Sequence, residues 1–108
     1  MIDQVQAQLD AYNARDIDAF MACYADDVII EDADGNIISQ AQEPMRARYG
    51  AMFAQYPELH CTLVTRVRIG DHVIDEEHVT GRVPNLVHAV AIYRLAADGR
   101  IARVRFLR

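Results

Sequence analysis

Apolar residues recur every three or four positions in three segments of the first half of the chain, which predicts three amphipathic helices. The first helix is expected over residues 2 to 14. The second begins after Asp16, a favourable N-cap residue, and should stop near residues 25–26. The third has Pro44 in its first turn and ends at Pro57. Their buried stripes are Ile2, Val5, Leu9 and Tyr12, then Ile17, Phe20, Met21 and Tyr24, then Met45, Tyr49, Met52, Phe53 and Tyr56.

The rest of the chain has the pattern of strands. β-branched residues at 28–30 predict a strand that runs into Asp32, and a tight turn at 34–36 joins it to a short partner at 37–38. From Leu59 onwards the strand pattern dominates. Helices followed by an antiparallel meander indicate an α+β fold, not a parallel βαβ sheet. The meander should comprise residues 59–69, 72–80, 87–95 and 100–107, with a loop over 81–86 that holds Pro84.

Composition limits the class of protein. A chain of 108 residues has room for one core, so residues 1–108 should form a single domain. The formal net charge is −5 and the chain contains no Lys, which argues against a nucleic-acid partner. The start of the chain has no basic segment before an apolar one, so no secretory leader is expected, and no apolar run is long enough to predict a membrane helix. Cys23 and Cys61 lie far apart in apolar surroundings, which favours free thiols in a reduced, cytoplasmic protein.

The predicted sheet has two faces, and three helices cannot cover both. The face that the helices leave uncovered also carries Val, Ile and Leu. We therefore expect the protein to form a homodimer through the outer face of the sheet. Arg103 and Arg105 alternate with Val104 and Phe106 on the last strand. Period two then turns Val104 and Phe106 toward the pocket and the arginines toward this interface.

Several segments together resemble the ketosteroid isomerase and polyketide cyclase (SnoaL)-like branch of the nuclear transport factor 2-like superfamily. The resemblance covers nearly the whole chain. It implies a cystatin-like fold in which three N-terminal helices pack on a strongly curved antiparallel sheet around a cone-shaped pocket. The segments that carry it are 12–20 and 24–32 at the opening, and 91–95 with 98–101 at the closing hairpin.

The resemblance also implies a site. The isomerases place an Asp base at the end of the first strand, where this chain has Asp32, with tyrosines matched by Tyr24 and Tyr49. Two positions depart from the pattern. The oxyanion-hole tyrosine is matched by Gln8, and the protonated Asp that assists it is matched by Ala91. True ketosteroid isomerase activity is therefore not expected.

Asp32 has two interpretations. If Ile30 faces the pocket, period two places Asp32 there as well, and an apolar wall would raise the pKa of its carboxyl group. Such a group can remove a proton next to a carbonyl or activate a water. Alternatively, Asp32 opens the sequence Asp-Ala-Asp-Gly, where Asp is common for local hydrogen bonding alone.

Other residues are candidates for substrate binding. Glu77 shares one face of its strand with Asp75, while Glu76 and His78 share the other; the pattern does not decide which pair enters the pocket, although the apolar neighbours of Glu77 favour it. Aromatic candidates can equally be core residues with paired hydroxyls. The histidines lack metal-ligand spacing, so no metal is expected. The full set of substrate-binding candidates is Tyr12, Tyr24, Tyr49, Phe53, His60, Glu77, Ala91, Tyr93 and Val104.

These observations predict a protein with a pocket for a small hydrophobic ligand. The first hypothesis is a cofactor-independent isomerase, cyclase, dehydratase or hydrolase, with Asp32 as general base. The alternative is a non-catalytic ligand-binding or dimerisation module of the same fold, because proton abstraction is slow without an oxyanion stabiliser.

Overall fold

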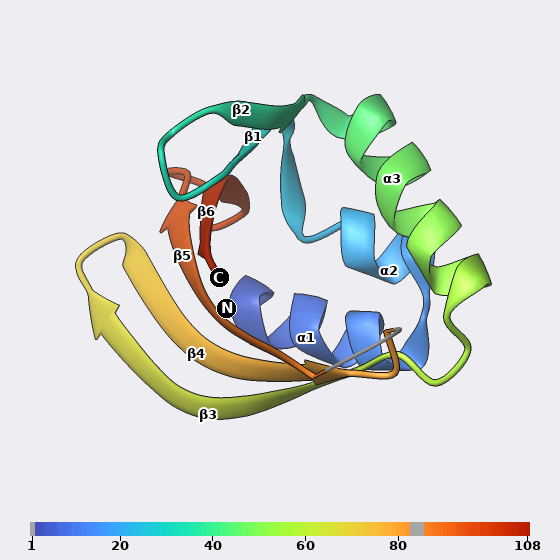
Figure 1. Ribbon diagram of the computed structural model, residues 1–108. Coiled ribbons are helices and arrows are strands. Elements are labelled where there is room, and N and C mark those ends of the chain that lie inside the picture. The colour runs from blue at the N-terminus through green and yellow to red at the C-terminus, as the bar shows by residue number, and fades with distance from the viewer. Residues whose placement is uncertain (1, 83–85) are drawn as a thin grey trace.

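The computed structural model describes residues 2–82 and 86–108 and shows three helices against one curved sheet (Figure 1). The predicted α+β fold is confirmed. The helices are α1 (Gln4–Ala14), α2 (Ile17–Met21) and α3 (Gln42–Gln55). The strands are β1 (Tyr24–Glu31), β2 (Ile37–Gln40), β3 (His60–Ile69), β4 (His72–Thr80), β5 (Val87–Leu95) and β6 (Ile101–Leu107).

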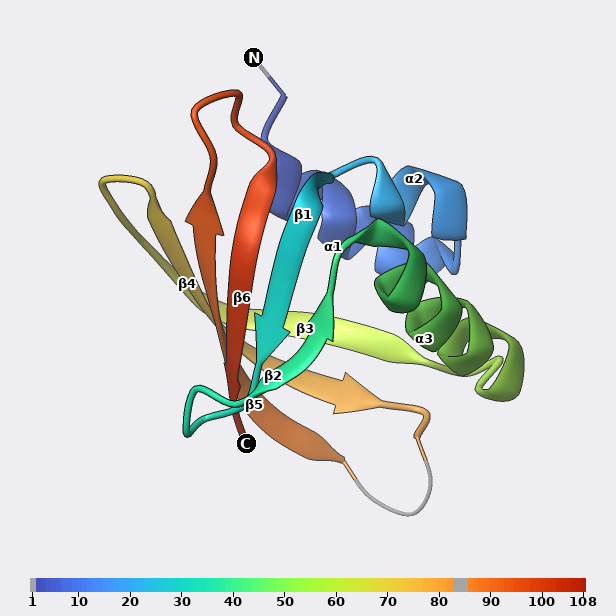
Figure 2. The same ribbon diagram turned by 90° about the horizontal axis from the view of Figure 1, so that it is seen from above.

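The six strands form one sheet in the order β2-β1-β6-β5-β4-β3. Strands β3 to β6 make the expected antiparallel meander, and β2 pairs antiparallel with β1. β1 lies parallel to β6, so the first and last strands along the chain are neighbours within the sheet. All three helices lie on the concave side of the sheet, and its outer side bears no helix in the described part of the chain (Figures 1 and 2).

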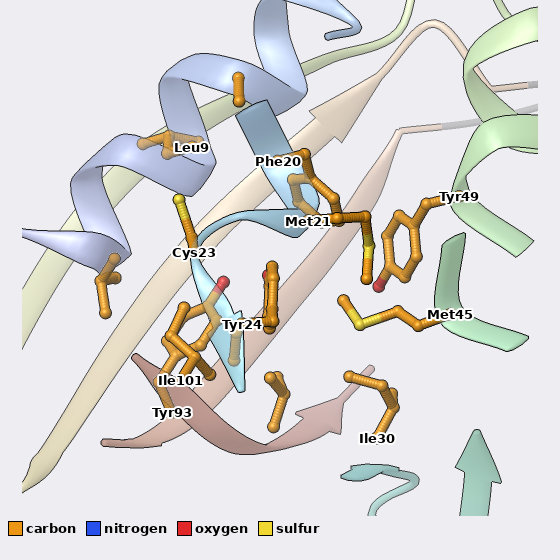
Figure 3. Close-up of a cluster of buried hydrophobic side chains, with 14 of the residues drawn as sticks. Leu9, Phe20, Met21, Cys23, Tyr24, Ile30, Met45, Tyr49, Tyr93 and Ile101 are labelled. Atoms are coloured by element: carbon orange, nitrogen blue, oxygen red, sulfur yellow. The ribbon is translucent and has the colours of Figure 1, made fainter. Parts of the chain in front are cut away.

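The core lies between the helices and the concave face. Phe20 of α2 stacks against Tyr24, Tyr49 and Phe53, with ring centroids 4.9 to 5.6 Å apart. Val104 of β6 is buried in the same core. Figure 3 shows side chains from all three helices gathering with those of the strands in this layer. A close-packed layer of this kind holds the sheet's curvature and so sets the shape of the space enclosed beneath α1.

The second helix is shorter than the pattern predicts. It ends at Met21, and residues from Tyr24 onwards already belong to β1. The carbonyls of Met21, Tyr24 and Ala25 accept hydrogen bonds from the Gln42 side chain, and the Cys23 carbonyl accepts from Ile101 N–H. Tertiary partners therefore replace the next turn of helix. β1 begins at Tyr24, four residues before the strand predicted at 28–30, and the other helices and strands lie within a residue or two of the predicted ends. Pro84, in the predicted loop, lies outside the described residues.

Within the residues that the structure describes, no helix is long and apolar enough to cross a membrane.

Candidate active site

A small cavity opens between α1, α3 and the concave face of the sheet. Its volume is about 40 Å³, which is room for a few water molecules before any side chain moves. Most of its wall is aromatic or aliphatic, and the polar groups are few. The lining residues are Gln8, Leu9, Tyr12, Phe20, Tyr24, Tyr49, Met52, Cys61, Glu77, Val79, Arg82, Val87, Ala89, Tyr93, Phe106 and Arg108.

Glu77 is the acidic group of this cavity. Its strand, β4, turns Glu77 inward, and the residue is 7% exposed. Directly across the ladder on β5 stands Ala89, whose small side chain leaves open space in front of the carboxyl group. Burial raises the pKa of the Glu77 carboxyl from its usual 4.5 to about 7, against the lowering effect of the neighbouring Cys61 thiol. Glu77 can therefore accept and release a proton near neutral pH.

Asp75 lies on the same face of β4 but has a different role. It is fully buried. Arg66 of β3 donates hydrogen bonds to both carboxylate oxygens, from Nε to Oδ1 at 2.7 Å and from Nη2 to Oδ2 at 2.9 Å. The same guanidinium also donates to Gln6 of α1 at 2.8 Å. A bidentate ion pair that is also tied to a neighbouring helix is a structural element, so Arg66 holds Asp75 in place outside the cavity.

Gln8 joins α1 to the sheet through a chain of hydrogen bonds. Its Nε2 donates to the Val5 carbonyl at 3.0 Å and to the Tyr93 hydroxyl at 3.1 Å, while its Oε1 accepts from the Tyr24 hydroxyl at 3.0 Å. A carbonyl can only accept, so the Val5 contact fixes which end of the amide is which. Both Nε2 hydrogens are then in use, and the Tyr93 oxygen is an acceptor in this bond.

The Tyr93 hydroxyl hydrogen consequently remains available to a group in the cavity. Burial raises the pKa of Tyr93 well above 10, and the nearby Glu77 charge adds to the effect. Tyr93 therefore keeps its proton and can donate it in a hydrogen bond. Because Tyr24 donates to Gln8 and Gln8 donates to Tyr93, each bond polarises the next and strengthens this final donor.

The Cys61 thiol is not activated. It lines the cavity, but burial and the neighbouring Glu77 raise its pKa, so the thiol is the stable form. In residues 2–82 and 86–108 there is no group of three or more His, Cys, Asp or Glu side chains that could hold a metal.

Asp32 does not lie where the resemblance implies. Its carboxylate accepts from the backbone N–H groups of Asp34 and Asn36, at 3.0 and 2.9 Å, and from the Asn36 side chain at 3.2 Å. The expected rise in the pKa of Asp32 is also wrong, because the Asn36 N–H above all lowers it. The strand register shifts between Ile30 and Glu31, and β1 ends there, so period two no longer carries Asp32 to the inner face. The turn interpretation is the correct one.

The other candidates divide into two groups. Tyr12, Tyr24, Tyr49, Glu77 and Tyr93 all line the cavity. The remaining four do not: Phe53, Ala91 and Val104 are buried in the core layer, and His60 is exposed at the start of β3. Ala91 pairs with Asp75 across the β4–β5 ladder. The next inward-facing pair, Ala89 and Glu77, is the one that lines the cavity. Alternation along a strand predicted which face these side chains occupy, but not how far along that face the cavity extends.

Several lining residues escaped prediction as site residues. Arg82 carries no pattern that marks it, and Arg108 follows the last strand. The resemblance matched Gln8 to the oxyanion-hole tyrosine but did not place Gln8 among the substrate-binding candidates. One signal was present for Gln8, since it is a polar residue on the same helical face as Val5 and Leu9. A buried amide on an apolar stripe needs partners, and this one has three.

Comparison with known proteins agrees with this architecture. The model of the SnoaL-like domain family matches residues 5–104. The chain belongs to the SnoaL-like domain family. Among solved structures, a cystatin-fold protein from Novosphingobium aromaticivorans is similar to this SnoaL-like protein at 27% identity, with 97% of this chain and 95% of that one covered and a TM-score of 0.90. A candidate polyketide cyclase from Sinorhizobium meliloti is 25% identical over 99% and 95% of the two chains, with a TM-score of 0.85.

A third structure, with a ketosteroid isomerase-like fold and bound trimethylamine, comes from Catenulispora acidiphila. It is 20% identical to the SnoaL-like protein over 98% of this chain and 85% of that one, with a TM-score of 0.80, and it shows the fold alone. No curated protein matches the chain.

Proposed function

We propose that this SnoaL-like protein binds a small organic molecule in the cavity and transfers a proton on it without a cofactor, with Glu77 as the acid–base group. The observation that carries the proposal is the placement of Glu77. It is a buried carboxyl group facing open space, with a pKa of about 7, in a wall that also presents the Tyr93 hydroxyl. Titratable groups shifted toward neutrality in a cleft are typical of acid–base sites.

The simplest reaction is removal of a proton from a carbon next to a carbonyl. The proton passes to the Glu77 carboxylate, and the electron pair of the C–H bond moves toward the carbonyl oxygen, giving an enolate. Tyr93 donates a hydrogen bond to that oxygen, in the manner of an oxyanion hole, and the chain from Tyr24 through Gln8 supports it. The hydrogen-bond donor in this site is therefore Tyr93 on β5. In the isomerase pattern the donor would be a tyrosine at position 8, where this chain has Gln8.

The fate of the enolate decides the reaction class. Return of the proton to a different carbon is an isomerisation, attack on a second carbonyl is a cyclisation, and loss of a β-hydroxyl is a dehydration. Similarity to a candidate polyketide cyclase at 25% identity supports enolate chemistry in general. All three outcomes need the same first proton transfer, so that step is the one to test.

The test uses a panel of small cyclic ketones in deuterated water. NMR measures the rate at which solvent deuterium exchanges into each ketone. Wild-type protein should accelerate exchange at the carbons beside the carbonyl. Glu77→Gln should lose at least about a hundredfold of that rate, because it keeps the size of the side chain and removes the base. The matched control is Asp32→Asn, which alters an acid outside the cavity and should leave the rate unchanged.

Two results would contradict the proposal. One is exchange that proceeds equally in Glu77→Gln. The other is a panel member that binds tightly in the cavity and never exchanges, which would favour the non-catalytic binding module.

A further inference from the structure

A second hollow adjoins the cavity on the side of α3. Its volume is about 30 Å³, and it shares Tyr49, Met52, Arg82, Phe106 and Arg108 with the cavity wall. Shared walls make the two spaces neighbouring parts of one site, with Glu77 and Tyr93 lining the first part and not the second. A ligand that fills the first part can therefore extend into the second.

Three arginines line this second hollow, and we name them the arginine rim: Arg48 of α3, Arg82 after β4 and Arg108 after β6. No acidic residue is among the lining residues of that hollow. Every ion pair found among residues 2–82 and 86–108 involves other arginines or histidines, so no described carboxylate side chain forms an ion pair with the rim. The chain as a whole has a net charge of −5, so the arginine rim is a local region of positive charge on an acidic protein.

The backbone holds Arg82 close to this position. Gly81, which precedes it, has φ +82° and lies so near the Glu58 backbone that an added Cβ would meet the Glu58 carbonyl oxygen at 2.1 Å. Glycine thus allows the end of β4 to pack directly on the turn that follows α3. The rim's charge also reaches the tyrosine between the two hollows, since Arg108, Arg48 and Arg82 all lower the pKa of Tyr49 against the effect of burial.

We infer that the ligand carries a carboxylate, which the arginine rim binds while the carbonyl end of the same molecule lies between Glu77 and Tyr93. Arginine side chains match a carboxylate with paired N–H donors. A monoanion suits the site better than a phosphate dianion because Glu77 lies in the adjoining space and repels added negative charge. This inference rests on the proposed function for the position of the carbonyl end.

The probes are 4-oxocyclohexanecarboxylate and its carboxamide, which have nearly the same shape and differ in charge. Binding is measured by calorimetry at low ionic strength, and deuterium exchange beside the ketone is followed in the same samples. The carboxylate should bind at least about tenfold more tightly than the amide. Arg82→Gln and Arg48→Gln should each lose most of that preference and leave amide binding unchanged. The matched control is Arg46→Gln, which removes one positive charge from the same helix as Arg48 and lies outside both hollows.

The outcomes separate this inference from the proposed function. Equal binding of acid and amide, equal effects of Arg82→Gln and Arg46→Gln, or no binding of either probe would overturn the carboxylate assignment. If the amide still exchanges in a Glu77-dependent way, the proposed function stands without it. If the acid binds through the arginine rim but Glu77→Gln catalyses deuterium exchange as fast as wild type, the carboxylate assignment is supported and the proposed function is contradicted. Unchanged thermal stability of Arg48→Gln, on the exposed side of α3, shows that its effect is on binding.

Discussion

Asp75 and Glu77 project from the same face of β4, and Arg66 pairs with Asp75 while Glu77 faces the cavity. Two carboxyl groups two residues apart thus have opposite environments. Repulsion from Asp75 is one cause of the raised pKa of Glu77, after burial, and the Arg66 charge acts against it. Pairing one acid and isolating the other is how a single strand can hold both a structural carboxylate and a proton-transfer group.

Stability should depend on pH through Glu77. The folded pKa is about 7 and the reference value is 4.5, so the folded protein binds more protons than the unfolded chain between these values. The contribution of Glu77 to stability is therefore fully present below pH 4.5 and is lost as pH rises through 7. Over that window Glu77→Gln should gain roughly 3 kcal/mol of unfolding free energy relative to wild type.

Denaturant unfolding of wild type and Glu77→Gln at several pH values between 4.5 and 8 measures this difference. Asp32→Asn is the control, since its carboxylate lies in the β1–β2 turn. A stability difference between wild type and Glu77→Gln that stays constant over this range would contradict the assigned pKa.

Removal of Arg66 should affect both stability and the acid–base profile. Arg66→Gln leaves Asp75 buried without its partner, which typically costs about 3–5 kcal/mol of unfolding free energy. Because Arg66 lowers the pKa of Glu77, its loss should raise that pKa further and move the rising limb of the exchange rate to higher pH. The double variant Arg66→Gln/Asp75→Asn should recover part of the stability. A profile that does not move in Arg66→Gln would contradict the electrostatic effect of Arg66 on Glu77.

The hydrogen bonds from Tyr24 to Gln8 and from Gln8 to Tyr93 should contribute to stability together, so that mutations in them are not additive. Gln8→Met removes the partner of the buried Tyr24 hydroxyl and should cost about 1–3 kcal/mol of unfolding free energy. Adding Tyr24→Phe removes the orphaned hydroxyl as well, so the double variant should be less destabilised than the sum of the two single variants. Thermal and denaturant unfolding of the four proteins completes the cycle. Strict additivity would mean that the bond contributes nothing.

Sequence patterns predicted the fold because burial alternates with the right period in almost every element. On β4 the alternation left two pairs open, and only the apolar neighbours of Glu77 favoured the face that the structure turns inward; on β5 the alternation indicated the inward face of Tyr93. Asp32 failed because one register shift and one turn interrupt the period, and a local pattern cannot show either. Gln8 and the arginine rim depend on contacts between elements far apart in the chain. Gln8 and Tyr93, for example, are separated by 85 residues.

The outer face of the sheet should bind a second copy of the chain. Ile74 and Ile92 face each other across β4 and β5 on this side and remain half-buried, with Arg94 toward one end of the strands and Glu76 toward the other. A twofold axis near the isoleucines would bring Arg94 of each copy toward Glu76 of the other, which makes the face self-complementary. Ile92→Glu should convert a dimer to monomer in sedimentation equilibrium, whereas Ile37→Glu, on β2, should not. Wild-type protein that sediments as a monomer would refute this arrangement.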